Sequence, residues 1–231
     1  LHPKAPALSS KKIEVFAKGG FPSLVLGEKQ AFVQRYGVFS DYWKQATPAI
    51  REGYSEELKL HLVELAQHYH AEAQAGKKPQ QYMDAARWYR EYLATFPKDK
   101  NAPLMNSLLG EALFAAEDYQ GAIAEFERTA YEYDAHENAQ KAGYFALLSY
   151  EGFLKKMSRT DPAREGWITK EIASTMRFVK AWPSDTHVPE LMENVLDSQL
   201  ALNDMKGAQT TADLIIKRVP PAQRRALEAM L

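Results

Sequence analysis

Residues 92–103, YLATFPKDKNAP, and residues 178–189, FVKAWPSDTHVP, decide the fold because they are two copies of one pattern. The copies align without a gap, so that Tyr92 meets Phe178 and Pro97 meets Pro183. The same offset brings the later stretch 118–122, DYQGA, onto 204–208, DMKGA. A constant offset across two separate motifs indicates an internal repeat.

Each copy predicts two antiparallel helices. Pro103 and Pro189 can occupy the first turn of a helix, where a missing N–H does no harm. Apolar residues then follow at helical spacing, as Leu104, Leu108 and their successors do. Pro97, Pro183 and Pro220 end the second helices, because proline and the residue before it disfavour helix continuation. The sequence therefore predicts an all-α fold, a right-handed α–α superhelix (solenoid) of helical hairpins. The sole candidate strand is PSLVLG (22–27).

Residues 108–134, LLGEALFAAEDYQGAIAEFERTAYEYD, resemble a tetratricopeptide repeat. The family has a small residue in the first helix, a small residue opening the second, and an aromatic four residues later. Gly110, Ala122 and Phe126 match these positions, whereas Asp134 stands where the family usually has proline. The resemblance implies a scaffold that binds other proteins and is not an enzyme.

The repeats also set the expected domain organisation. Residues 1–55 would be an N-terminal segment, a partial hairpin or a cap, with one helix over 27–37. TPR-like repeats would fill 56–220, at about 58–97, 101–134, 137–183 and 187–220. Residues 221–231 would be a C-terminal helix, either a cap or the start of a further repeat.

Residues 85–133 are also similar in style to bacterial periplasmic and outer-membrane assembly TPR proteins. This similarity implies a periplasmic or cell-envelope location. The chain starts at Leu1 and shows no signal peptide, so we expect a mature chain or a segment of a longer repeat protein.

Composition narrows the function classes. The chain has no cysteine, which excludes disulfides, thiolate nucleophiles and Cys-based zinc sites. A net charge of −1 gives no sign of a nucleic-acid partner. Arginines lie between aromatic residues in ARWYREY (86–92), as in some single-strand binders, but Tyr89 and Tyr92 fall at packing positions of the repeat. No apolar run is long enough to predict a membrane span.

One group of residues could carry other chemistry. His61, Glu64, His68 and Glu72 share one helical face, and such side chains can hold a transition metal. Their spacing differs from that of helical metalloprotease and di-iron motifs, which favours a solvated face instead. The alternative function is therefore a ligand- or metal-binding module attached to an envelope enzyme or export system. We expect no cofactor and no catalytic residue, since no phosphate loop or nucleophile elbow is present.

Helical solenoids usually bind partners on the concave surface formed by the first helix of each hairpin. The residues expected there recur one or two turns apart. They are Val63, Gln67 and His70; Ser107, Glu111 and Phe114; Tyr144, Leu148 and Glu151; and Glu193, Asp197 and Leu200. The resulting groove would be acidic with apolar spots. We therefore expect protein partners with basic segments, alongside neighbouring repeats of a longer chain.

Overall fold

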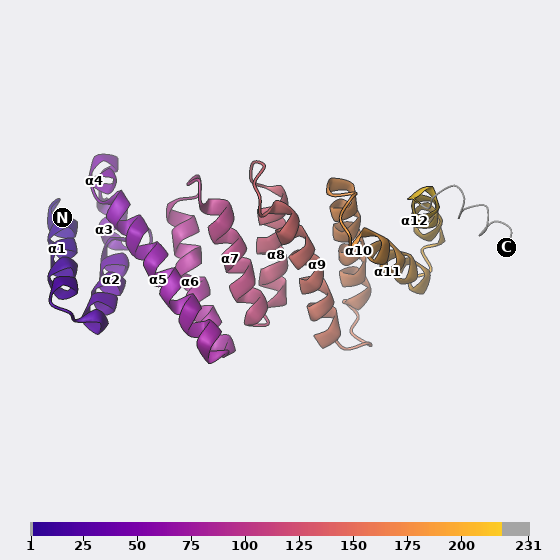
Figure 1. The fold of residues 1–231 in the computed structure, drawn as a ribbon, viewed down its shortest axis with the longest axis horizontal. Helices are drawn as coiled ribbons and strands as arrows, with labels where there is room; N and C mark the ends of the chain where they lie inside the picture. The colour runs from indigo at the N-terminus through magenta and orange to yellow at the C-terminus, as the bar shows by residue number, and fades with distance from the viewer. Residues whose placement is uncertain (1, 219–231) are drawn as a thin grey trace. The chain divides into compact units, whose positions relative to one another are not determined.

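The computed structural model describes residues 2–218, and within this range the chain is all-α, without a β-strand (Figure 1). The all-α prediction is thus confirmed. The helices form two compact units, Leu1–Asn138 and Ala139–Leu231. Among residues 2–218, no helix is both long and apolar enough to cross a lipid bilayer. The predicted C-terminal helix at 221–231 lies outside the described residues.

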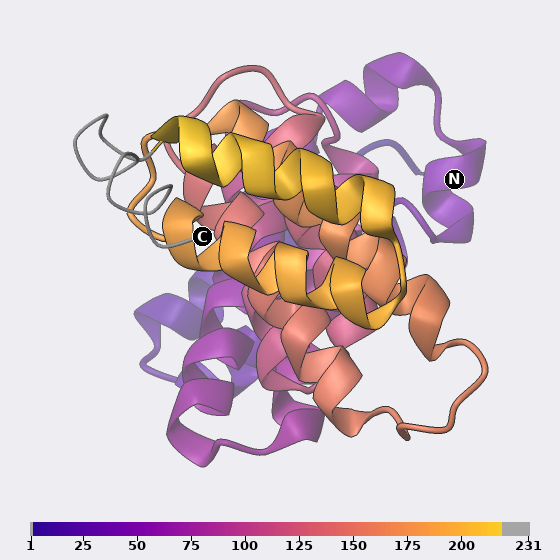
Figure 2. The same ribbon diagram turned by 90° about the vertical axis from the view of Figure 1, so that its right-hand side faces the viewer.

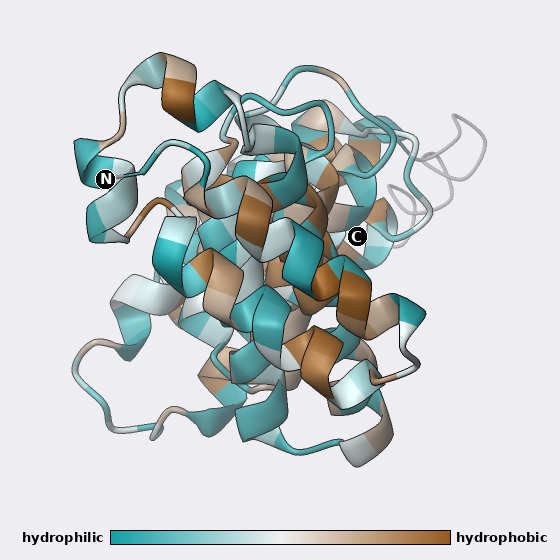
Figure 3. Cartoon of the chain, turned by 90° about the vertical axis from the view of Figure 1, so that its left-hand side faces the viewer, coloured by the Kyte–Doolittle hydropathy of each residue, from teal (hydrophilic) through white to brown (hydrophobic). Residues whose placement is uncertain are grey.

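The first unit stacks its helices in chain order. Its elements are α1 (Ala5–Lys18), α2 (Pro22–Tyr36), α3 (Asp41–Gln45), α4 (Pro48–Glu52), α5 (Ser55–Gly76), α6 (Pro79–Thr95), α7 (Ala102–Ala115) and α8 (Tyr119–Tyr131). Helix α1 packs on α2, α2 on α5, and each later helix on the next. Brown and teal segments alternate along the helices in Figure 3, the pattern of helices that bury one face.

The second unit contains α9 (Ala139–Lys156), α10 (Arg164–Ala181), α11 (Val188–Ala201) and α12 (Met205–Arg218). Figure 2 shows α11 and α12 side by side, and the two helices pack on each other. Helix α10 contacts both α9 and α11. The buried core comes from all three of these helices: Leu147, Phe178, Val179, Val188 and Met192.

The candidate strand at 22–27 was wrong, because these residues form the first turns of α2. Pro22 stands at the start of the helix, where its fixed φ suits helical geometry. The apolar run Leu24–Val25–Leu26 has no β neighbour to pair with, and Leu24 stays 47% exposed. Helix α2 therefore begins earlier than the predicted helix at 27–37, and it forms an antiparallel pair with α1.

The two copies of the repeated turn have the same backbone geometry. Glu117 and Asn203 adopt left-handed conformations with φ of 62° and 58°. The next residue in each copy caps the following helix: Asp118 Oδ1 accepts the Gly121 N–H at 3.1 Å, and Asp204 Oδ1 accepts the Gly207 N–H at 3.0 Å. Such caps satisfy N–H groups that lack a partner within the helix. The duplication thus extends from sequence to local hydrogen bonding.

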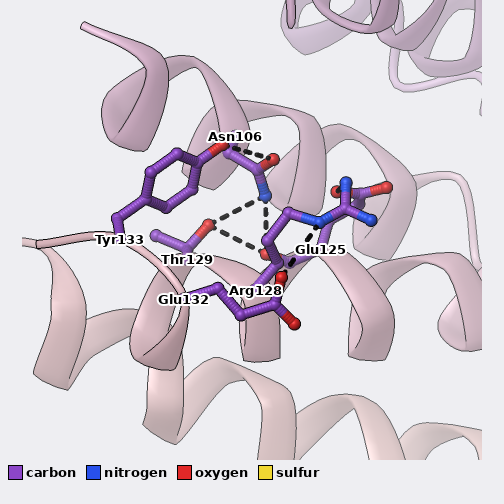
Figure 4. A network of polar contacts seen from close by, with 6 residues as sticks. All are labelled: Asn106, Glu125, Arg128, Thr129, Glu132 and Tyr133. Carbon is purple, nitrogen blue, oxygen red and sulfur yellow. Dashed lines mark hydrogen bonds and ion pairs between the residues drawn. The ribbon is translucent and has the colours of Figure 1, made fainter. Parts of the chain in front are cut away.

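A buried polar network joins α7 to α8 (Figure 4). Asn106 Nδ2 donates to the Glu125 carbonyl oxygen at 2.7 Å and to Thr129 Oγ1 at 3.0 Å. The Tyr133 hydroxyl donates to Asn106 Oδ1 at 3.2 Å. Because Asn106 and Thr129 are almost fully buried, each of these bonds prevents a costly unpaired polar group. The network fixes the register of the two helices.

Two glycines allow the helices of a pair to approach closely. A Cβ atom at Gly110 of α7 would lie 2.7 Å from the Phe126 ring of α8. A Cβ atom at Gly143 of α9 would lie 2.7 Å from the Trp182 ring and 3.0 Å from the Phe178 ring. Phe126 and Phe178 are fully buried, so neither ring has room to withdraw. In both pairs, a missing side chain in the first helix makes space for an aromatic ring of the second.

Gly110→Ala is expected to destabilise the first unit by about 1–3 kcal/mol, the usual cost of overpacking a core. The matched control is Gly27→Ala in α2, where no atom lies within 4 Å of the added Cβ. There the same change should stabilise by about 0.5–1 kcal/mol, because alanine favours helix more than glycine does. Urea unfolding of both variants measures the difference. Equal effects at the two positions would contradict the close contact with Phe126.

Candidate functional site

A groove in the second unit is walled by α9 and α11 and floored by α10. Its cavity volume is about 130 Å³. The apolar lining consists of Leu147, Leu148, Ile172, Leu191 and Val195. The polar lining consists of Tyr144, Glu151, Glu171, Thr175, His187, Glu190, Asn194 and Ser198. No lysine or arginine is among these lining residues.

One end of the groove is an ordered aromatic wall. The Tyr144 ring stacks on the His187 ring, with 4.0 Å between centroids and 26° between planes. His187 Nδ1 lies 2.8 Å from Asp185 Oδ1, and Asp185 Oδ2 accepts a hydrogen bond from Gln140 Nε2 at 2.7 Å. Burial alone would raise the pKa of Asp185, but hydrogen bonds from the His187 backbone N–H, Gln140 and the His187 ring hold the pKa below its usual value. The carboxylate is therefore ionised and orients both neighbouring side chains.

Three glutamates line the rest of the groove. Burial, together with the nearby negative charge of Glu151, raises the pKa of Glu171 to about 7 against the opposing effect of Arg164. Glu151 is 52% exposed and forms an ion pair with Lys155 at 2.6 Å, a surface contact of small energy. Glu190 lies at the exposed rim. The groove thus combines carboxyl groups with the apolar side chains of its lining.

The structure brings together the three residues that the sequence predicted on α9. Tyr144 and Leu148 are half-buried and Glu151 is exposed, and all three line the groove. Their spacing of four and three residues puts them on one face of the helix. This face is directed at α11 across the floor of α10, so these three predicted positions share one site.

The predicted residues on α11 do not line the groove. Glu193, Asp197 and Leu200 are exposed, but the wall of the groove is made by Glu190, Leu191, Asn194, Val195 and Ser198. The prediction placed these residues on the concave surface of a solenoid; they are exposed, but on another face of α11 than the residues that line this cavity. A shift of three residues along a helix turns the side chain by about 300° around the helix axis, which equals 60° in the opposite direction. Glu193 and Asp197 therefore lie on a different face from Glu190 and Asn194, which line the groove.

Two predicted residues of the first unit are buried and cannot form a binding surface. Ser107 is 5% exposed, because α7 is covered by α6 on one side and α8 on the other. His70 is 8% exposed, and its Nδ1 lies 2.9 Å from the Tyr89 hydroxyl, a hydrogen bond between α5 and α6. The prediction had placed both side chains at the surface, and that placement was wrong.

The other predicted residues of the first unit remain accessible but do not form one site. Val63, Glu111 and Phe114 are half-buried, and Gln67 is exposed. Glu111 lies near His70 and Tyr89. Burial is the main cause that raises the pKa of Tyr89, and the negative charge of Glu111 raises it further. It therefore belongs to the contact region between the α5–α6 pair and α7. The aromatic residues of ARWYREY are packing residues, since Trp88, Tyr89 and Tyr92 are at most 1% exposed.

Sequence reasoning missed the floor of the groove, because it considered only the first helix of each pair. Glu171 lies seven residues before Phe178, on the stripe of α10 that carries the buried residues Ser174, Thr175 and Phe178. A carboxylate on an otherwise buried stripe is an unusual pattern, and it could have identified Glu171. His187 was overlooked as part of a turn.

The metal alternative gains no support from the geometry. Within residues 2–218, no group of three or more His, Asp or Glu side chains is arranged to hold a metal ion. His61, which the solvated-face interpretation placed at the surface, is 6% exposed and packs edge-on against Phe32 with ring centroids 4.9 Å apart. Glu64 instead forms an ion pair with Lys29 at 2.8 Å, and His68 is exposed.

The raised pKa of Glu171 makes stability depend on pH. The pKa of this carboxyl is 4.5 in the unfolded protein and about 7 in the folded protein. Between pH 4.5 and pH 7, the folded protein therefore binds more protons than the unfolded protein does. This contribution to stability is complete below about pH 4.5 and is lost as the pH rises through 7. Glu171→Gln should therefore lose less stability than wild type between pH 5 and pH 8. Urea midpoints at both pH values measure it, with Glu193→Gln as the control; identical pH dependence in all three proteins would contradict the burial of Glu171.

Comparison with known proteins adds no assignment. No protein-family model matches the chain. No curated protein matches it significantly either. The case for a function therefore rests on the geometry of the groove and on the pattern of the repeats.

Proposed function

We propose that this chain is a TPR-like protein-interaction module of a bacterial cell envelope, which binds partner polypeptides and catalyses no reaction. Its helix pairs would continue one another as a right-handed α–α superhelix. Support comes from the stacking of successive helices within each unit and from the contact of Gly110 with Phe126. Support for the envelope location is the resemblance of residues 85–133 to periplasmic and outer-membrane assembly repeats, together with the absence of cysteine.

The observation that carries the binding proposal is the charge of the groove in the second unit. Glu151, Glu171 and Glu190 line it with no lysine or arginine among its lining residues. Leu148, Ile172 and Val195 supply apolar surface in the same cavity. A lysine or arginine side chain complements both the glutamates and the apolar lining, because its head is cationic and its stem is apolar. The partner is accordingly a polypeptide segment that inserts a basic side chain.

A cavity of about 130 Å³ accommodates a single side chain rather than a whole helix. Specificity would thus come from one anchoring residue, with the rest of the segment lying along α9 and α11. The stacked rings of Tyr144 and His187 would form a flat wall against the stem or a neighbouring peptide group. A cation beside Glu171 also favours the ionised form of this carboxyl, and so opposes the burial and the charge of Glu151 that keep it partly protonated near pH 7.

The test compares two pairs of substitutions that each replace two carboxyl groups with amides. Glu171→Gln with Glu190→Gln changes the groove, whereas Glu193→Gln with Asp197→Asn changes the exposed side of α11. The probe is a fluorescein-labelled nonapeptide with two lysines among leucines, and its analogue has glutamine in place of lysine. Wild type should bind the lysine peptide about tenfold more tightly than the analogue, a preference of about 1.4 kcal/mol. Fluorescence anisotropy measures both affinities.

The groove variant should lose this preference and the α11 variant should keep it. Binding should weaken as NaCl is raised, because ions screen exposed charges. The complex should also release protons at pH 6.5, which calorimetry in two buffers of different ionisation enthalpy detects. An equal loss in both variants would show a general effect of net charge and overturn the assignment of the groove. If the groove variant alone loses the preference, capture from an envelope fraction with wild type and the two variants would identify the natural partner.

A further inference from the structure

The first unit contains a larger cavity with different chemistry. Its volume is about 640 Å³, within the range of roughly 300–1,000 Å³ typical of small-molecule pockets. One end, at the turn between α1 and α2, is apolar and includes Phe21, Val25 and Leu26. The other end is polar, where Lys29 of α2 meets Glu64 and His68 of α5. A cavity with one apolar and one polar end suits an amphiphilic ligand.

The charge of this region favours an anion at the polar end. Lys29 is the sole lysine or arginine among the residues lining the cavity, and its side chain is 17% exposed. Helices α1 and α2 carry more basic than acidic side chains: Lys11, Lys12, Lys18, Lys29 and Arg35 against Glu14 and Glu28. Helix α5, which shares the polar end, carries four glutamates against one lysine, so the attraction for an anion comes from Lys29 and the basic residues of α1 and α2. The ligand head complementary to this end is therefore negatively charged.

In the structure, Lys29 Nζ pairs with Glu64 Oε2 at 2.8 Å, so an incoming anion must compete with this carboxylate. His61 offers Glu64 a second partner. The ring is buried, neither of its nitrogens has a hydrogen-bond partner, and Nδ1 lies 3.6 Å from Glu64 Oε2. Burial lowers the pKa of His61 against the opposing effects of Glu64 and Glu57, so the ring is neutral at pH 7 and can carry its proton on Nδ1.

We propose that this cavity binds a small carboxylate with an aliphatic tail. The tail lies against Phe21, Val25 and Leu26, and the carboxylate pairs with Lys29. Glu64 turns from Lys29 towards His61 Nδ1, which donates a hydrogen bond to it. In the bound state the ligand carboxylate pairs with Lys29, and Glu64 accepts a hydrogen bond from the neutral His61 ring. This site is separate from the groove of the second unit and does not depend on the function proposed for that groove.

Isothermal titration calorimetry at pH 7 with octanoate, octanol and acetate tests the proposal. Octanoate should bind at least about tenfold more tightly than octanol, which lacks the charge, and acetate, which lacks the tail, should not saturate the site. Lys29→Met should weaken octanoate about tenfold and leave octanol within about twofold. Lys44→Met is the matched control: Lys44 pairs with Asp41 on the surface and does not line the cavity, so octanoate binding should not change.

Two further variants separate the pocket from general effects on the fold. Ser23→Trp places a large side chain at an exposed lining position and should abolish binding of both ligands without loss of helicity. His61→Phe keeps the ring but removes the second donor, so it should weaken octanoate severalfold and leave octanol unchanged. The proposal is overturned if octanoate does not bind at millimolar concentration, if octanol binds equally well, or if Lys29→Met leaves the affinity for octanoate intact.

Discussion

The close contact between a glycine of one helix and an aromatic ring of the next is the constraint on which two helix pairs, α7–α8 and α9–α10, depend. At Gly110 the ring is Phe126, and at Gly143 the rings are Phe178 and Trp182. Because these rings pack directly against the backbone of the facing helix, they fix the distance between the two helices of the pair and the rotation of one helix against the other. The groove inherits this geometry: Tyr144 follows Gly143 in α9, and its ring contacts Phe178, with centroids 6.2 Å apart.

Local features of the fold were readable from the sequence because local residues determine them. The turns at Asp118 and Asp204 are alike since each has an aspartate cap preceded by a residue in the left-handed conformation. The face of α9 that lines the groove followed from helical spacing. The face of α11 that lines the groove did not, because spacing within one helix does not show which of its faces the neighbouring helices leave open. The face of a helix that stays accessible depends on the helices packed on both sides of it, and the residues of those helices are not local in the sequence.

The polar residues that matter most were also the least visible in the sequence. His61 looked like part of a solvated stripe, yet it is buried against Phe32 with no hydrogen-bond partner for its ring nitrogens. Glu171 looked like one charge among many on α10, yet burial and Glu151 shift its titration. In both cases part of the environment comes from another helix, α2 for His61 and α9 for Glu171. Periodicity identifies the helix face but does not determine what that face meets.

The two cavities have the same construction and opposite chemistry. Each is walled by helices from neighbouring pairs, α1 and α5 or α9 and α11, and floored by the helix between them. The charged floor residue is Lys29 in one cavity and Glu171 in the other. Neither residue holds its helix pair together, since buried aromatic and aliphatic side chains do so. Exchange of one floor residue would thus change the charge of a cavity while the helices stayed packed, so the chemistry of each cavity can vary separately from the scaffold around it.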